Sequence, residues 1–201
     1  MKVLEARFVT SATGAHDIPR DGVPHVALVG RSNVGKSSII NALAKTRLAR
    51  TSGAAGKTRL ANLYRFEVEG GPGGPGRWSM YLADLPGYGY ARGGRESVEE
   101  LRGIAEGYFS FEGIAGVLHL VDARHPGLET DVDAAEWLTT LNVKTATVAT
   151  KVDKLSRSDR TRNLKALERQ LGTAVTPTAA VNGEGLDDLW ILIARLSRRR
   201  P

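Results

Sequence analysis

The chain has 201 residues, 41% of them hydrophobic, and no cysteine. This length is typical of a single globular domain with its own core; the absence of cysteine excludes disulfides and thiolate metal sites and fits a cytoplasmic location. The formal net charge of +6 favours an anionic partner, RNA first, although a solvated basic surface would explain the charge equally well.

Strands and helices are predicted to alternate along most of the chain, from apolar or alternating runs and from helical spacing. The predicted strands cover residues 25–29, 60–69, 77–84, 116–121, 144–150 and 174–178. The predicted helices cover residues 36–45, 96–109, 129–140, 158–171 and 186–197. This order indicates an α/β fold with a six-stranded, mostly parallel sheet, helices on both faces, and one antiparallel edge strand from the 60–84 hairpin.

A phosphate-binding loop is predicted where GRSNVGKS fits the pattern G-x-x-x-x-G-K-[ST] between a strand and a helix. Its glycines let backbone N–H groups point at phosphate oxygens, and the helix N-terminus adds its dipole. Lys36 would neutralise the β- and γ-phosphates, and the Ser37 hydroxyl would ligate Mg²⁺. A chance glycine-rich turn is the alternative, and the pattern alone does not separate GTP from ATP. The residues predicted to bind here are Gly30, Arg31, Ser32, Asn33, Val34, Gly35, Lys36 and Ser37.

The segment DLPGYGYARGG contains too much glycine for the interior of a helix or strand. Asp84 ends a predicted strand in the form D-x-x-G, so its carboxylate can hold Mg²⁺ through a water. The Gly87 N–H can bond the γ-phosphate and release it after hydrolysis, although a surface turn is the alternative. Tyr88 stands where many GTPases carry a water-orienting glutamine, and packing against the domain or contact with a partner are both open to it. The residues predicted to contact the nucleotide here are Asp84, Leu85, Pro86 and Gly87.

The tetrapeptide TKVD follows another predicted strand and can separate guanine from adenine. The Asp153 carboxylate only accepts hydrogen bonds, so it can take N1–H and N2–H₂ of guanine, a donor pair that adenine lacks. The Lys151 stem can lie along the base plane. Thr150 stands where many GTPases have asparagine, so a base or loop contact is expected to differ. Further on, the Ala179 N–H can donate to guanine O6. The predicted base-site residues are Thr150, Lys151, Val152, Asp153, Thr178, Ala179 and Ala180.

These motifs predict a guanine-nucleotide site, because each follows a predicted strand and ligands bind at the carboxyl ends of such strands. A small-molecule kinase that uses the same phosphate loop is the first alternative. The second alternative is a division-site scaffold whose GTPase activity is incidental.

Taken together, the motifs resemble the EngB (YihA/YsxC) family of bacterial GTPases, in the TrmE-Era-EngA-EngB-Septin-like class. The matching segments are GRSNVGKSSIINAL, GKTRLANLYRF, LADLPGYGYA and TKVDKL, within residues 5–197. The resemblance implies a Ras-like P-loop G domain over residues 23–197, an N-terminal extension over 1–22 packed on it, and a basic tail over 198–201. It also implies GTP and Mg²⁺ binding, slow hydrolysis, a switch role in large ribosomal subunit assembly, and a need for the protein in normal cell division and septation.

The resemblance assigns the first switch to SGAAGKTRLAN, where Thr58 would close on Mg²⁺ and the γ-phosphate. The family usually has proline where Ala55 stands, and the TAAVNGEG segment leaves the base contact uncertain by one residue. Asn33 could ligate K⁺ through its side-chain carbonyl, or it could only brace the loop. The predicted catalytic residues are Lys36, Thr58 and Asn33. The first-switch residues predicted to bind GTP are Gly56, Lys57, Thr58, Arg59 and Leu60.

The helix predicted over 158–171 has an apolar stripe and, about 200° around it, a basic stripe. We expect the basic stripe to contact rRNA of a large-subunit precursor, with a solvated helix face as the alternative. The apolar stripe is Leu164, Leu167 and Leu171, and the basic stripe is Arg162, Lys165 and Arg169. We expect a monomer without DNA as a partner, and no membrane partner because no apolar run approaches the ~20 residues of a spanning helix.

Histidine and tryptophan are given structural roles. The histidines lack metal-ligand spacing, and His125 is expected to pack locally in the loop after a predicted strand. The tryptophans fall on predicted elements where packing is expected. The residues concerned are His16, His25, His119, His125, Trp78, Trp137 and Trp190.

Overall fold

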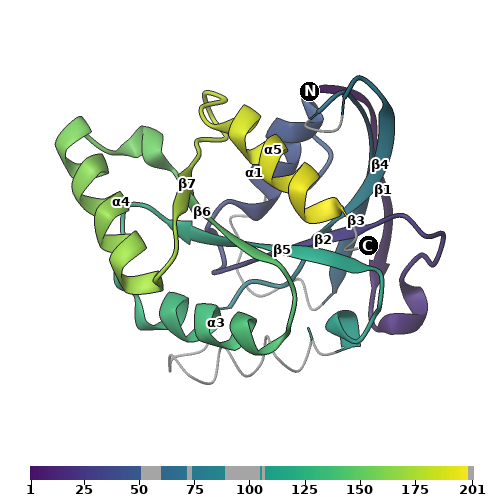
Figure 1. Cartoon of the computed structure of the whole chain (residues 1–201), viewed down its shortest axis with the longest axis horizontal. Coiled ribbons are helices and arrows are strands. Elements are labelled where there is room, and N and C mark those ends of the chain that lie inside the picture. The colour runs from purple at the N-terminus through teal and green to yellow at the C-terminus, as the bar shows by residue number, and fades with distance from the viewer. Residues whose placement is uncertain (51–59, 72–73, 89–104, 106, 199–201) are drawn as a thin grey trace.

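The computed structural model describes residues 1–50, 60–71, 74–88, 105 and 107–198, and these build a sheet of seven strands (Figure 1). The strands are β1 (Lys2–Ala12), β2 (His25–Gly30), β3 (Ala61–Glu69), β4 (Arg77–Asp84), β5 (Ile114–Asp122), β6 (Thr145–Thr150) and β7 (Val175–Pro177). The α-helices are α1 (Lys36–Ala44), α3 (Glu129–Thr140), α4 (Arg157–Leu171) and α5 (Leu186–Ser197). The short 3₁₀ helices are η1 (Ala15–Asp17) and η2 (Val152–Lys154).

The strand order is β1-β3-β4-β2-β5-β6-β7, with β4, β2, β5, β6 and β7 mutually parallel. The predicted fold class is confirmed, but the predicted number of six strands is wrong, since β1 adds a seventh strand antiparallel to β3. Two register shifts, between Val3 and Glu5 and between Phe8 and Thr10, break the alternation of β1, so its sequence carries no clean period of two. The sheet therefore has two antiparallel pairings at one side, β1 with β3 and β3 with β4, and β3 is the strand that runs against the others.

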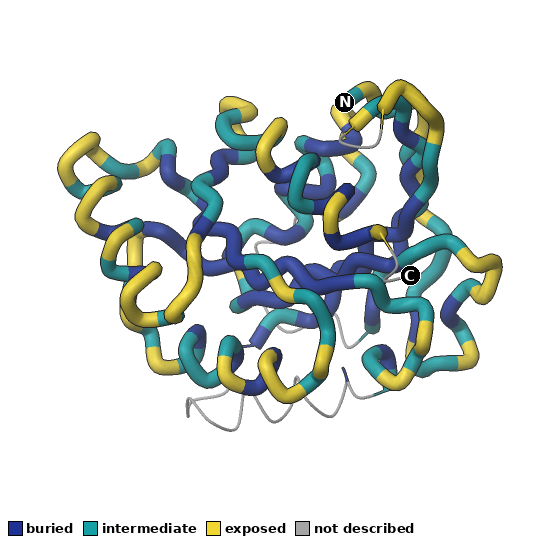
Figure 2. The backbone as a smooth tube through the Cα atoms, in the orientation of Figure 1, coloured by how far each residue is buried: buried dark blue, intermediate teal, exposed yellow. Residues whose placement is uncertain are grey.

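Helices cover both faces of the sheet, with α1 and α5 on one and α3 on the other (Figure 1). Ile39 and Leu43 of α1 and Ile193 of α5 are buried against apolar residues of the central strands. Full burial of one such side chain contributes about 1.5–3 kcal/mol. Figure 2 shows the central strands as the buried layer, with exposed residues gathered on the outer helices and loops. The helix predicted over 96–109 lies mostly outside the described residues, although 107–109 are helical.

The tryptophans pack as predicted, with Trp137 and Trp190 buried and Trp78 half-buried. Among the histidines, His25 and His119 are fully buried. The packing role predicted for His125 is wrong, because this side chain is exposed in the turn after β5.

The parallel strands bring the predicted motifs to one edge of the sheet. Gly30 ends β2, Asp84 ends β4 and Thr150 ends β6. Asp84 lies in register with Leu28 of β2, and Asp122 of β5 with Thr150. In the part of the chain that the structure describes, no helix is long and apolar enough to cross a bilayer.

Candidate nucleotide site

The phosphate loop turns from β2 into the first turn of α1. Gly35 is the N-cap of α1 and has φ 117°, and Asn33 has φ 60°, so both lie in the left-handed region. Glycine reaches this region without strain, which explains its place immediately before the helix. The loop therefore delivers the N-terminus of α1, with its unpaired N–H groups, to the edge of the sheet.

Three predicted phosphate and metal residues converge here. Lys36 is buried, and its Nζ donates to the carbonyl oxygens of Gly30 (3.0 Å) and Arg31 (3.2 Å). Ser37 Oγ donates to Asp84 Oδ2 at 2.8 Å. Burial raises the pKa of Asp84 above its usual value, although the Lys36 charge and the Ser37 hydrogen bond act in the opposite direction. A hydroxyl and a carboxylate side by side are hard oxygen ligands of the kind that Mg²⁺ prefers, so these residues fit that ion.

The D-x-x-G turn lies directly on the phosphate loop. The Ser32 N–H donates to the Tyr88 carbonyl oxygen at 2.9 Å. A Cβ atom on Gly87 would lie 2.6 Å from Ser32 N and Cα and 2.9 Å from Lys36 Nζ. Only glycine permits this approach, because these contacts are shorter than real Cβ atoms show. Leu85 and Pro86 are buried behind the turn.

The Tyr88 side chain points into the core between β5 and α3. It is 2% exposed, and its hydroxyl donates to Asp131 Oδ1 at 2.8 Å. Its oxygen lies 3.0 Å from His119 Nε2, which must then be the protonated ring nitrogen and the donor. The packing interpretation of Tyr88 is confirmed, and the ring is unavailable to orient water at a bound phosphate.

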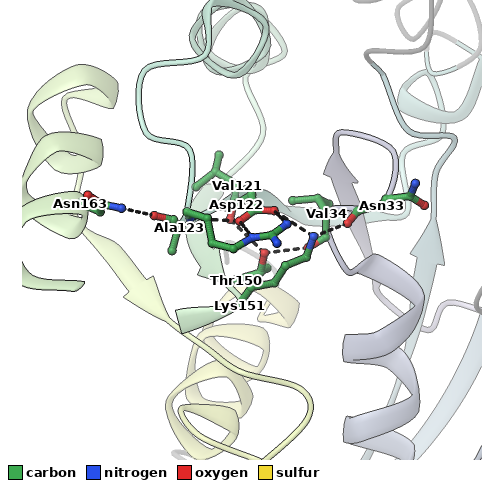
Figure 3. Close-up of polar contacts among 9 residues, drawn as sticks. Asn33, Val34, Val121, Asp122, Ala123, Thr150, Lys151 and Asn163 are labelled. Atoms are coloured by element: carbon green, nitrogen blue, oxygen red, sulfur yellow. Dashed lines mark hydrogen bonds and ion pairs between the residues drawn. The ribbon is translucent and has the colours of Figure 1, made fainter. Parts of the chain in front are cut away.

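Thr150 and Lys151 tie the base-reading segment to the phosphate loop (Figure 3). Thr150 Oγ1 donates to Val34 O at 2.7 Å and lies 3.1 Å from Val121 O. Lys151 Nζ donates to Asn33 O at 2.6 Å, so its aliphatic stem is stretched from the end of β6 to the loop. The threonine at position 150 thus contacts the loop through its hydroxyl.

Asp153 lies in η2 and is half-buried, with its Oδ2 3.2 Å from Lys154 Nζ. The interpretation of Ala179 as the donor to guanine O6 needs correction, because its N–H already donates to Glu184 O at 2.9 Å. That bond belongs to a bridge that closes the loop before α5. Ala180 carries the next amide along the chain and replaces Ala179 as the candidate.

Val152 and Thr178 of the predicted base site are buried. The first-switch residues divide into two groups. Leu60 is half-buried just before β3. Outside the described residues lie Gly56, Lys57, Thr58 and Arg59. Sequence reasoning missed Asp122, Arg124 and Asp131, although Asp122 ends β5 as the motif residues end their strands.

Comparisons with known proteins agree with this geometry. The family model described as "50S ribosome-binding GTPase" matches residues 25–151. A protein named "Probable GTP-binding protein EngB" from Anaeromyxobacter sp. (strain K) is 39% identical over a 206-residue alignment covering 100% of this chain and 95% of that protein. The chain belongs to the EngB family of GTP-binding proteins. A protein of the same name from Pelotomaculum thermopropionicum is 41% identical to this chain, and the alignment covers 97% of this chain and 96% of that protein.

Solved structures show the same fold. A crystal structure of a probable GTP-binding protein EngB superposes with a TM-score of 0.60 at 22% identity, covering 88% of this chain and 100% of that one. Era from Aquifex aeolicus, bound to GDP·AlF₄⁻, gives a TM-score of 0.70 at 24% identity over 89% of this chain. The chain spans 58% of the length of that Era. As an EngB-family member with this fold, the protein is a GTPase, which removes the small-molecule-kinase alternative.

Proposed function

We propose that this GTPase is a slow molecular switch that binds a precursor of the large ribosomal subunit and is needed, through that role, for normal cell division and septation. The family description "50S ribosome-binding GTPase" supports a ribosomal partner. Era has been crystallised with MgGDPNP and nucleotides 1506–1542 of 16S ribosomal RNA, and that chain is 25% identical to this one with a TM-score of 0.65. The same structure covers 89% of this chain and 58% of Era.

The proposal that the protein is a switch rests on the contact of Gly87 with the phosphate loop. Because the D-x-x-G turn touches Ser32 and Lys36, a phosphate held by the loop and the position of the turn must affect each other. Loss of the γ-phosphate would then change the surface that this turn offers to a partner. Ser37 and Asp84, with Thr58 from the first switch, would hold Mg²⁺, which neutralises charge on the β- and γ-phosphates.

We assign binding of the guanine base to the side chains of Asp153 and Lys151 and to the backbone N–H of Ala180. Hydrolysis is expected to be slow without a partner, because the residue at the glutamine position is Tyr88 and its side chain is buried in the core. Such unassisted GTPases turn over on the order of 10⁻⁴ to 10⁻² per second.

Replacement of Asn33 by alanine is expected to abolish a K⁺-dependent acceleration of GTP hydrolysis while GDP binding is retained. Asn33 is exposed, and among the described residues its side chain has no hydrogen-bond partner, so its carbonyl is open to a cation. Turnover would be measured in K⁺ and Na⁺ buffers for wild type and Asn33→Ala. Equal wild-type turnover in the two buffers, alone and with ribosomal subunits, would leave Asn33 a structural residue.

The exposed face of α4 is the proposed rRNA contact. As predicted, Arg162, Lys165 and Arg169 are exposed while Leu167 is buried on the other side. Arg162 is partly neutralised by Asp159, whose Oδ1 lies 2.6 Å from Nη2. The helix packs beside β7 at the end of the sheet (Figure 1), so this face is turned away from the core.

Simultaneous replacement of Arg162, Lys165 and Arg169 by alanine is expected to weaken binding to large-subunit particles and flatten its salt dependence. Each lost phosphate contact lowers the slope of log K against log salt by about 0.7–0.9. Co-sedimentation at several salt concentrations measures this, with GTP affinity expected to be unchanged. A matched control replaces three exposed cations on the β1 side, namely Lys2, Arg7 and Arg77. If the α4 variant binds the particles as tightly as wild type at every salt concentration, this helix face is only a solvated surface. If binding of wild type does not depend on salt, the scaffold alternative is favoured.

A further inference from the structure

Three buried polar side chains meet behind the D-x-x-G turn, on the face of the sheet that α3 covers (Figure 1). They are Tyr88, His119 of β5 and Asp131 in the first turn of α3, each no more than 2% exposed. The Tyr88 hydroxyl donates to Asp131 Oδ1 at 2.8 Å and accepts from His119 Nε2 at 3.0 Å. A hydroxyl that donates and accepts at once has a fixed orientation, so the tyrosine is held by two elements of the fold.

The backbone of the same tyrosine lies on the phosphate loop. Its carbonyl oxygen accepts the Ser32 N–H at 2.9 Å, and Arg31 and Tyr88 form a parallel β-bridge. Gly87, one residue earlier, approaches the loop so closely that a Cβ atom would lie 2.6 Å from Ser32 N and 2.9 Å from Lys36 Nζ. Tyr88 therefore joins the phosphate loop, through its backbone, to β5 and α3, through its hydroxyl.

Packing alone does not account for a carboxylate at this place. Among the described residues, Asp131 Oδ2 and His119 Nδ1 have no hydrogen-bond partner. Burial of polar groups that are only partly paired costs stability, and apolar side chains of similar volume would fill the space without this cost. The two hydrogen bonds to Tyr88 are thus what these polar side chains supply here.

We propose that Asp131 and His119 are positioning residues of the switch, because they hold the side chain of Tyr88. With Tyr88 held, the N–H of the preceding Gly87 stays where the γ-phosphate of GTP would bind. This inference rests on the switch proposed above, in which Gly87 contacts that phosphate. Glycine has more backbone conformations to lose than any other residue. A glycine that its neighbour already holds loses fewer of them when the phosphate binds, so the contact is stronger.

The test compares wild type, Tyr88→Phe, Asp131→Leu and the double variant. Calorimetry with Mg²⁺ measures the affinities for GDP and for a non-hydrolysable GTP analogue. Each single variant is expected to bind the analogue roughly three- to tenfold more weakly, the scale of one protein hydrogen bond. GDP has no γ-phosphate, so its affinity is expected to stay within about twofold of wild type. The double variant is expected to match Tyr88→Phe, because that substitution already removes the bond to Asp131.

Tyr81→Phe is a matched control. Tyr81 is also buried, and its hydroxyl also donates to an aspartate, Asp21 Oδ2, at 2.9 Å. It lies in register with His25, which begins β2, whereas the phosphate loop follows the other end of that strand. This variant is expected to unfold at a lower temperature than wild type and to keep the wild-type ratio of analogue affinity to GDP affinity. The control separates a positioning role from a loss of stability.

Three results would overturn the inference: unchanged analogue affinity in Tyr88→Phe, equal losses for the analogue and GDP, or a loss in the double variant that equals both single losses combined. Thermal unfolding of each variant shows that the compared proteins are folded. Should Tyr88→Phe not fold, Asp131→Leu carries the same expectation, because it removes the acceptor and keeps a side chain of similar size.

Gly87→Ala tests the proposed γ-phosphate contact itself. The added Cβ would meet Ser32 and Lys36, so this variant is expected to lose more affinity for the analogue than for GDP. If Gly87→Ala keeps the wild-type ratio of the two affinities, the switch proposal fails and the inference falls with it. If Gly87→Ala changes the ratio and Tyr88→Phe does not, the positioning role of Asp131 and His119 alone is wrong.

Discussion

The Asp153→Asn variant is expected to bind GTP roughly 5- to 150-fold more weakly than wild type and to bind xanthosine triphosphate better. Asparagine replaces one carboxylate oxygen by an N–H₂ donor, which faces a guanine donor and leaves it unpaired. Such a contact costs about 1–3 kcal/mol, more where charge is involved. Xanthine carries an oxygen at C2, and the new donor can pair with it.

The measurement is the affinity of GTP, xanthosine triphosphate and ATP for wild type and for Asp153→Asn. Asp187→Asn is a matched control, because this exposed carboxylate lies in the first turn of α5 and is not part of the site. The control is expected to keep the wild-type order of affinities. Undiminished GTP affinity in Asp153→Asn would remove Asp153 from the base site.

The Tyr88→Ala variant is expected to lose about 3–5 kcal/mol of unfolding free energy, as for other buried aromatic residues. Tyr88→Phe keeps the ring and is expected to lose about 1–3 kcal/mol, because His119 and Asp131 lose their shared partner. Urea unfolding measures both values. Phe8→Ala is a suitable control, since that ring is 48% exposed and should cost less. A loss in Tyr88→Ala no larger than in this control would contradict the role of Tyr88 as a core anchor.

The loss in Tyr88→Phe is expected to depend on pH. Burial raises the pKa of Asp131 from 3.8 to about 6, although the Tyr88 hydrogen bond pulls it down. Ionisation of Asp131 therefore weakens the native state as pH rises from about 4 to 6, and the weakening is complete above that range. The hydroxyl limits this penalty, so the difference between wild type and Tyr88→Phe should be larger at pH 7.5 than at pH 4.5. A difference that is constant over this range would contradict a hydrogen bond to the ionised carboxylate.

The part of the site that follows from local sequence could be predicted. Gly30, Asp84 and Thr150 end parallel strands, and parallel strands place such ends at one edge whatever their order. The two stripes of α4 follow from helical spacing alone, and the structure has Leu167 buried and Lys165 exposed.

The rest depends on contacts between distant segments. The bulges in β1 hide its alternation, and only pairing with β3 defines it as a strand. Nothing near Asp122 in the sequence shows that Lys151 reaches it, because that pairing depends on β5 lying beside β6. The hydrogen bond from the Ala179 N–H to Glu184 O likewise depends on how the following loop folds back, which local sequence does not show.

The central claim is that guanine nucleotide in this site controls binding to large ribosomal subunit particles. Its most direct test is co-sedimentation of wild type and Asp153→Asn with 50S subunits and precursor particles. Each protein is loaded with GDP, a non-hydrolysable GTP analogue or the corresponding xanthosine analogue. Wild type is expected to bind the particles more tightly with the GTP analogue than with GDP, and Asp153→Asn is expected to require the xanthosine analogue. Equal binding of wild type in every nucleotide state, or binding of Asp153→Asn that still follows the GTP analogue, would contradict the claim.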